Sequence, residues 1–226
     1  MRSLAKWHIW LGWLVGVPIA MWLATGLFMT PRPIEQVRGD QLRREVEAPA
    51  LVLPGSAPAS PEAGLKEMRV VMQQGRPVAM LTGLDGSVRR VDFATGAAIP
   101  PLDPAAARAL VAERLEGGDK AERITPFPAD RSPHDFRQSL AVWQVALADG
   151  TNVFVGRETG EIEAVRTRWW RAFDFAWGLH IMDLSEREDT SHPVLILFAA
   201  LSLTGALIGC VLMFRRRRAR PIKPLT

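Results

Sequence analysis

The sequence predicts an α+β protein in which two transmembrane helices flank a small domain of a helix packed on antiparallel β-meanders. Two uncharged apolar runs, Trp7–Met29 and Pro193–Phe214, are each long enough to cross a hydrocarbon layer of about 30 Å as a helix. All 24 acidic residues lie between the two runs. A pattern of turn residues occurs twice in the same interval, 64 residues apart, and predicts a duplicated β unit.

The first apolar run has two interpretations, an uncleaved membrane anchor and a cleaved secretory signal. The run of 23 residues is longer than the apolar core of a signal peptide. Its end reads Leu27-Phe28-Met29-Thr30, which lacks the small-x-small pattern of a cleavage site. We therefore expect a membrane helix.

Small residues recur every four positions in both runs and predict close helix packing. Gly12, Gly16, Ala20 and Ala24 form such a row in the first run, and Gly205 and Gly209 in the second. We expect the two helices to pack on each other within one chain. Dimerisation into a four-helix bundle is an alternative that is compatible with this packing.

The basic residues outside the central segment predict the topology. Arg2 and Lys6 precede the first run, and six Lys or Arg residues follow the second, beginning with Arg215. Because cytoplasmic flanks are rich in Lys and Arg, both termini should be cytoplasmic and residues 31–192 extracytoplasmic. The tails carry the excess positive charge, so the pI near 10 indicates contact with the lipid bilayer and not with nucleic acid.

The segment before the second run resembles an interfacial helix. Trp170, Phe173, Trp177 and Ile181 fall on one face at helical spacing. Tryptophan favours the membrane–water interface, so we expect this face to enter the lipid boundary.

A linker should separate the first helix from the folded domain. Pro31–Glu47 is polar, and Ala48–Gly64 is rich in Pro, Ala, Ser and Gly. We expect ordered structure to begin near Leu65.

The duplicated unit is marked by two pairs of turns. Asp85-Gly86 is followed by Thr95-Gly96, and Asp149-Gly150 is followed at the same spacing by Thr159-Gly160. Asp-Gly suits a tight hairpin turn and Thr-Gly marks the next one.

One helix is predicted between the two units. Asp103 can cap its start, Pro104 suits its first turn, and Gly117-Gly118 ends it. The expected organisation, in chain order, is a cytoplasmic start and first membrane helix (1–30), a polar segment and linker (31–64), the α+β domain (65–167), an interfacial segment and loop (168–192), the second membrane helix (193–214) and a basic tail (215–226).

These motifs resemble the PepSY and PepSY-associated transmembrane family. The helix start Asp-Pro-Ala-Ala-Ala, the Asp-Gly turn and Glu-Thr-Gly-Glu are similar to a PepSY unit. Lys6–Gly12 with Thr25-Gly26 looks like the family's first membrane helix. Gly178–Asp183, then Ser191-His192-Pro193 and Thr204-Gly205, look like its second membrane segment.

The resemblance implies a bacterial inner-membrane protein with an outward-facing domain. Family members have been connected with inhibition of peptidases, and larger members with haem-bearing reduction of iron complexes. This chain has two predicted spans where the larger members have four or more. A haem held between helices would therefore need a second copy of the chain or another membrane protein.

Four residues are candidates for binding haem b, which is the cofactor that such a redox role requires. His8 shares the small-residue stripe of the first run, and Met213 follows Gly209 by four residues on the second. His180 and His192 are predicted at the outer surface. His and Met are both axial ligands of haem iron. Each His has a plainer interpretation as a hydrogen-bonding anchor at the interface.

Other chemistry has little support in the sequence. Cys210 is the single cysteine and lies in the second run, so no intrachain disulfide can form. His134 is expected in an exposed loop, and the acidic cluster at 183–189 is expected to be a solvated loop and not a metal site. No motif for a catalytic nucleophile, a zinc protease or a phosphate-binding loop occurs, so no catalytic residue is assigned.

The leading functional prediction is a non-catalytic accessory protein that binds a protein or peptide partner outside the membrane. An extended peptide can be accepted by strand addition, and Gln144, Val153 and Glu163 lie on candidate strands. The alternative is a haem protein that transfers electrons across the membrane, as a dimer or with a membrane partner, to an iron complex. A third prediction is a tether that only positions a partner.

Overall fold

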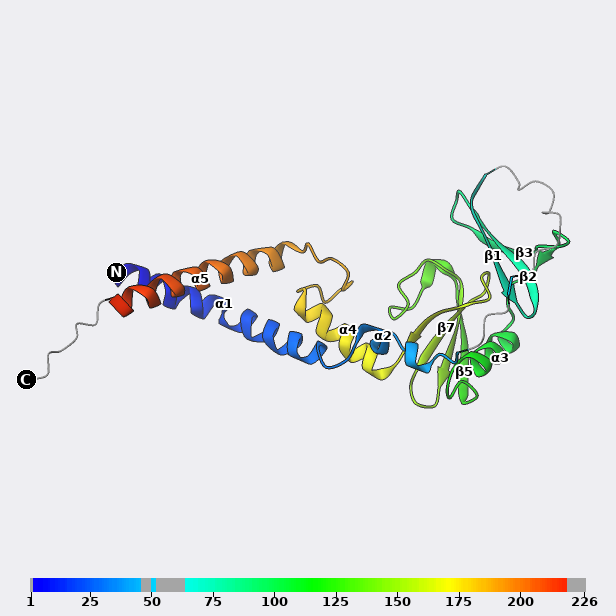
Figure 1. Cartoon of the computed structure of the whole chain (residues 1–226), viewed down its shortest axis with the longest axis horizontal. Coiled ribbons are helices and arrows are strands. Elements are labelled where there is room, and N and C mark those ends of the chain that lie inside the picture. Colours follow the sequence, from blue (N-terminus) through cyan, green and yellow to red (C-terminus); the bar gives the residue numbers. More distant parts are fainter. Residues whose placement is uncertain (1, 46–49, 52–63, 219–226) are drawn as a thin grey trace, which may run out of the picture. The chain divides into compact units, whose positions relative to one another are not determined.

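The computed structural model describes residues 2–45, 50–51 and 64–218 (Figure 1). The chain divides into two compact units. One comprises Met1–Pro33 with Ala172–Thr226, and the other comprises Ile34–Arg171. The fold class is the predicted one, because two apolar helices flank two antiparallel four-stranded sheets.

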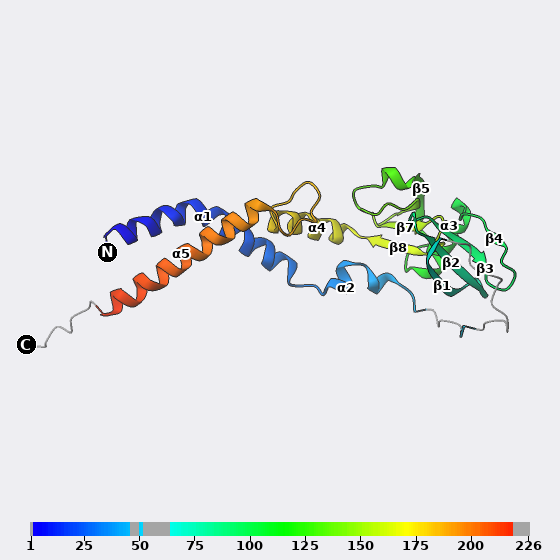
Figure 2. The ribbon, with the colours of Figure 1, turned by 90° about the horizontal axis from the view of Figure 1, so that it is seen from above.

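The first unit is built on two long helices, α1 (Arg2–Met29) and α5 (Pro193–Arg218). Ser3–Met29 and Pro193–Arg215 are long and apolar enough to span a membrane. The helices run antiparallel and cross each other (Figure 2). Side chains along the spans are open to the surroundings, as lipid contact requires, and Trp13 is 81% exposed.

The packing between these helices uses one of the two predicted rows of small residues. A Cβ added at Gly205 would lie 3.3 Å from the Leu11 side chain, and one at Gly209 would lie 2.9 Å from the His8 ring. In contrast, no atom lies within 4 Å of a Cβ added at Gly12 or Gly16. The residues of α1 that meet these glycines are His8 and Leu11, which are three positions apart, so Gly12 and Gly16 lie off the contact.

Helix α4 (Arg168–His180) forms where the interfacial segment was predicted, and protein contacts part of the face that was expected in lipid. The Arg166 guanidinium lies 4.3 Å from the centre of the Trp170 ring. The Trp177 indole N–H donates to the Arg187 carbonyl at 3.2 Å, and Ile181 is 3% exposed. Trp170 and Trp177 are only partly buried, and contact of this face with lipid stays a prediction.

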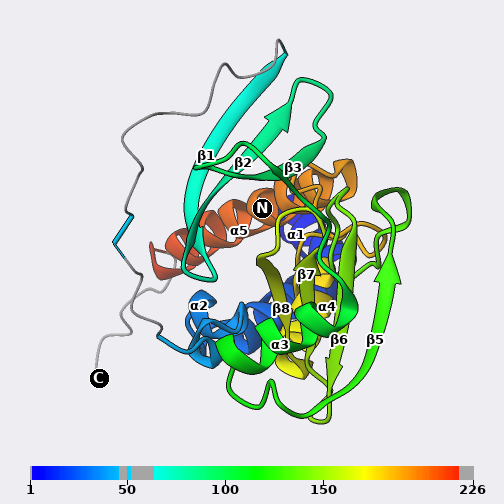
Figure 3. The same ribbon diagram turned by 90° about the vertical axis from the view of Figure 1, so that its right-hand side faces the viewer.

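The second unit contains two antiparallel meanders with the same strand order (Figure 3). The first sheet is β1-β2-β3-β4 and the second is β5-β6-β7-β8. Their bounds are β1 Leu65–Gln73, β2 Arg76–Gly83, β3 Val88–Asp92, β4 Ala98–Ile99, β5 Ala121–Phe127, β6 Val142–Leu147, β7 Asn152–Gly156 and β8 Ile162–Arg166.

The turns of the two sheets match as the repeat predicted. The glycines of the Asp-Gly turns, Gly86 and Gly150, have φ of 80° and 82°. Those of the Thr-Gly turns, Gly96 and Gly160, have φ of 71° and 65°. These left-handed angles favour glycine, because a Cβ would crowd the following carbonyl. The duplicated β unit is therefore confirmed.

The second sheet carries most of the core. Helix α3 (Pro104–Arg114) packs on β5 and β6, and the Asp103 carboxylate accepts a hydrogen bond from the Ala106 N–H at 2.8 Å, as the capping pattern predicted. The cluster that α3 forms with the second sheet contains eight buried residues, whereas the first sheet contributes a cluster of three, Ala79, Leu81 and Phe93.

Ordered structure in this unit begins earlier than the expected Leu65. Helix α2 (Ile34–Val37) and the short 3-10 helix η1 (Asp40–Leu42) precede the linker. Val37 is 1% exposed, and Arg43 forms a β-bridge with Leu115. A few apolar side chains thus dock a polar segment on the sheet, and composition alone does not indicate this. The Ala48–Gly64 linker prediction falls almost entirely outside the described residues.

Candidate functional site

A cavity of about 710 Å³ lies within the second unit, between the two β sheets. The end of η1, the β1–β2 hairpin, α3 and the β7–β8 turn all contribute to its wall. Its charged lining consists of Arg43, Arg44, Arg76, Arg90, Arg114, Glu113 and Glu161. Apolar side chains complete it, among them Val78, Ile99, Leu102, Leu110 and Ile162. With five arginines and two glutamates, the lining carries a net positive charge.

Several of these arginines are held in place by local structure. The Arg44 guanidinium donates to the Ala112 carbonyl at 3.1 Å, so its charge lies at the carboxyl end of α3, where the helix dipole favours a cation. Arg43 lies 3.6 Å from the Asp40 carboxylate, and Arg114 lies 3.1 Å from Glu113. Both pairs are partly exposed and so contribute little to stability.

Arg90 is the buried member of this lining, with 7% of its surface exposed. Its Nη1 donates to the Gln73 side chain at 3.1 Å, and its Nη2 donates to the Pro100 carbonyl at 2.9 Å. Among the described residues, its buried Nε–H has no acceptor. Burial lowers the pKa of Arg90, and the Glu158 carboxylate opposes this shift.

Contacts between the sheets close one side of the cavity. Arg69 on β1 forms an ion pair of 2.5 Å with Glu161 in the β7–β8 turn. The Gln73 side chain donates to the Thr159 carbonyl at 2.9 Å. Gly160 completes this contact, since a Cβ added there would lie 2.3 Å from Arg90 Nη1. The Thr-Gly turn between β7 and β8 thus docks on the first sheet.

Glu163, one of the candidate strand residues, lies on β8, which is an edge strand. Burial raises the pKa of its carboxyl above the ordinary value, while a hydrogen bond from Thr159 Oγ1 opposes the shift. Gln144 on β6 and Val153 on β7 lie on interior strands, so neither is at an edge that can add a peptide strand.

His180 is held at the end of the first helix by a short polar network. Its Nδ1 lies 2.9 Å from Thr25 Oγ1, and its carbonyl accepts a hydrogen bond from the Trp22 indole at 2.8 Å. The hydroxyl proton of Thr25 is donated to the Met21 carbonyl at 2.8 Å. The hydroxyl oxygen therefore accepts from His180 Nδ1–H. In the neutral ring this leaves the Nε2 lone pair available, the arrangement found in metal-ligating histidines.

The other three candidate ligands do not join His180. His8 lies against Gly209, and its buried Nδ1 has no partner among the described residues. Seventeen residues separate His8 from Thr25 along α1, or about 25 Å, so His8 and His180 of one chain cannot ligate the same iron. Met213 comes one turn after Gly209 and is half exposed.

His192 lies at the start of α5. Its carbonyl accepts from the Ile196 N–H at 3.2 Å, which is the role of an N-terminal cap. Its Nδ1 is buried without a partner among the described residues. The nearby loop is organised by Asp183, a buried carboxylate that accepts hydrogen bonds from Ser185, Glu186, Glu188 and Asp189.

These hydrogen bonds hold the pKa of Asp183 well below its ordinary value, and the bond from the Ser185 hydroxyl has the largest effect. Asp183 therefore serves as a loop anchor. In the described ranges, no group of three or more His, Cys, Asp or Glu side chains is placed to hold a metal ion.

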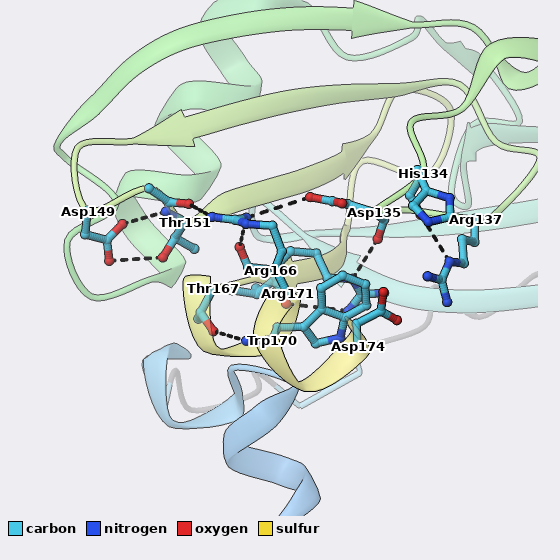
Figure 4. Close-up of polar contacts among 12 residues, drawn as sticks. His134, Asp135, Arg137, Asp149, Thr151, Arg166, Thr167, Trp170, Arg171 and Asp174 are labelled. Carbon is cyan, nitrogen blue, oxygen red and sulfur yellow. Dashed lines mark hydrogen bonds and ion pairs between the residues drawn. The ribbon is translucent and has the colours of Figure 1, made fainter. Parts of the chain in front are cut away.

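A second polar network joins the start of α4 to the second sheet (Figure 4). Arg171 Nη2 donates to the Gly150 carbonyl at 2.5 Å, and Nη1 lies 3.7 Å from the Asp135 carboxylate. Arg166 Nε donates to the Asp135 carbonyl at 2.9 Å and stacks on Trp170. Two local hydrogen bonds complete the network. The Thr151 N–H donates to the Asp149 carboxylate, and Arg137 Nε donates to the His134 carbonyl. This network is structural.

The cavity was not predicted, because its arginines come from segments that are far apart in the sequence. Comparison with known proteins gives one match. The family model described as the PepSY-associated TM region matches residues 5–226. No curated protein and no solved structure matches the chain.

Proposed function

The chain belongs to the family of the PepSY-associated TM region and is a membrane protein, and from this premise we propose that it is a non-catalytic accessory protein of the bacterial inner membrane. Its β-sheet unit faces the extracytoplasmic side and binds a protein or peptide partner. The distribution of Lys and Arg beyond the two spans supports this orientation.

The cavity between the sheets is the observation that carries this proposal. Its volume of about 710 Å³ lies in the range of ligand sites, and it combines an apolar interior with charged groups. The edge strands β1 and β8 both contribute residues to it, so a bound segment can also reach strand backbone.

Photo-crosslinking in native membranes tests the proposal. A benzoylphenylalanine replaces Arg76, which is exposed at the cavity, and in a matched control it replaces Glu122, which is exposed on β5. We expect one discrete adduct from the Arg76 position and none from the Glu122 position. Identical adducts at both positions, or none at either, would refute a partner at the cavity.

A second candidate function is haem-dependent electron transfer, which the tautomer of His180 favours. Thr25 Oγ1 fixes the Nδ1–H and leaves Nε2 for an iron. A bound haem would supply one-electron chemistry. A second ligand to the iron would come from a second copy of the chain or from a partner protein, because His8 lies at the far end of α1.

Absorbance spectra of the detergent-purified protein, oxidised and then reduced, test this candidate. Haem ligation by His180 predicts a Soret band that is lost in His180→Ala and retained in His134→Ala. A spectrum without a Soret band, from cells supplied with haem precursor, would eliminate it.

A further inference from the structure

We propose that the cavity between the sheets binds a peptide segment that carries a carboxylate next to a large apolar side chain. The carboxylate pairs with Arg90 and the apolar side chain enters the apolar part of the cavity. This inference rests on the proposed function and adds the chemistry of the partner.

Arg90 provides the anchor for the carboxylate. It is more than nine-tenths buried and lines the cavity, and its Nε–H has no acceptor among the described residues. A buried N–H of a charged group without an acceptor costs free energy. A ligand oxygen recovers it once a shift of the side chain presents the covered Nε–H to the cavity. The planar guanidinium fork matches a carboxylate better than it matches a neutral carbonyl group.

The carboxylates already in the lining do not neutralise all of its arginines. Glu161 pairs with Arg69, which lies outside the lining, and Glu113 pairs with Arg114. Arg76 is exposed at the β1–β2 hairpin and adds positive charge at the cavity. A lining with more arginines than glutamates favours an anionic ligand and raises its rate of association.

The apolar part of the cavity indicates that the ligand is more than a small anion. Val78, Leu110 and Ile162 lie on three different elements and all line it. A phosphate ion bound to the arginines would leave this surface and most of the volume uncovered. A peptide fills both parts, and its backbone can hydrogen-bond along the edge of β8, where Ile162 lies.

Fluorescence anisotropy with the full-length chain in nanodiscs tests the proposal. Three labelled decapeptides share an Ala and Ser background and differ only in a central pair, Leu-Glu, Leu-Gln or Ser-Glu. We expect the Leu-Glu peptide to bind at least about tenfold more tightly than either of the others, and to weaken as salt is raised.

Two variants assign the binding to the cavity. Arg90→Gln should weaken binding of the Leu-Glu peptide at least about tenfold. The variant should also no longer prefer the Leu-Glu peptide to the Leu-Gln peptide. Because Arg90 also contacts Gln73 and Pro100, this variant can lose structure. Arg76→Gln avoids that problem and should weaken binding several-fold. Arg89→Gln, next to Arg90 on β3, is the matched control and should bind as the unchanged protein does.

The outcomes separate the ligand chemistry from the proposed function. Equal binding of the Leu-Glu and Leu-Gln peptides, no binding of any peptide at millimolar concentration, or displacement of the Leu-Glu peptide by inorganic phosphate or oleate at comparable concentration would each overturn the inference. If the Arg76 position still cross-links a partner in that case, the proposed function stands. If neither assay gives a signal, both fall.

Discussion

The duplicated turns offer a matched pair of substitutions, Gly160→Ala and Gly96→Ala. The two glycines occupy equivalent positions, with φ of 65° and 71°. An alanine at either position incurs the same left-handed backbone penalty of about 1–2 kcal/mol. Their surroundings differ, because no atom lies within 4 Å of a Cβ at Gly96, whereas a Cβ at Gly160 would lie 2.3 Å from Arg90 Nη1.

Gly160→Ala must therefore move the Arg90 guanidinium. Arg90 is tethered to the Gln73 side chain and to the Pro100 carbonyl, and losing a hydrogen bond of a charged group costs about 1.5–3 kcal/mol. If one bond is lost, Gly160→Ala should lower the opening free energy of the first sheet by that amount more than Gly96→Ala. The difference corresponds to roughly 10- to 150-fold faster amide exchange.

Hydrogen exchange of the full chain in nanodiscs, followed by mass spectrometry, measures this difference on the amides of β1 and β2. Gly96→Ala should affect mainly its own turn. Adding Gly160→Ala to Arg90→Gln should add only the left-handed backbone penalty, because the shorter side chain leaves room for the new methyl group. Equal exchange in the two single variants, or additive effects in the double variant, would refute the docking role of Arg90.

Three further predictions concern the helix unit. Gly209→Ala should lower the Tm of the detergent-purified protein through overpacking of about 1–3 kcal/mol against the imidazole ring on α1, whereas Gly12→Ala should not; equal Tm values would contradict the observed contact. Thr25→Val leaves the Nδ1–H of His180 without an acceptor and should cost about 1–3 kcal/mol in thermal unfolding, while Thr25→Ser retains most stability. The carboxyl of Asp183 has a folded pKa below its ordinary value of 3.8, so its contribution is complete above that pH and is lost as the pH falls further. The Tm advantage over Asp183→Asn should therefore shrink below that pH, and a constant difference would argue against the loop anchor.

The features that the sequence predicted depend on neighbouring residues. Asp103 and Pro104 fix the start of α3, where the Asp103 carboxylate caps an N–H three residues further along. The Asp-Gly and Thr-Gly turns need only glycine at a left-handed position. The two spans follow from the absence of charge over a membrane-length run. In each case the local chemistry decides the structure.

The features that it missed depend on residues that meet only after folding. Thr25 and His180 are 155 positions apart, and they meet only when the end of α4 lies against α1. Val37 is buried although the surrounding segment is polar. The arginines of the cavity come from the segment after η1, from the first sheet and from the end of α3, so only the folded arrangement of these three elements brings them together.

The docking of α5 on α1 also has a consequence for the order of assembly. It closes a loop of about 160 residues, which contains the whole β-sheet unit. Closing a long disordered loop costs entropy that grows with its length. A folded sheet unit removes most of that freedom beforehand, so helix pairing loses less entropy once the sheets have formed. A substitution that loosens the sheets should then also weaken the pairing of the helices, although no side chain at the helix contact has changed.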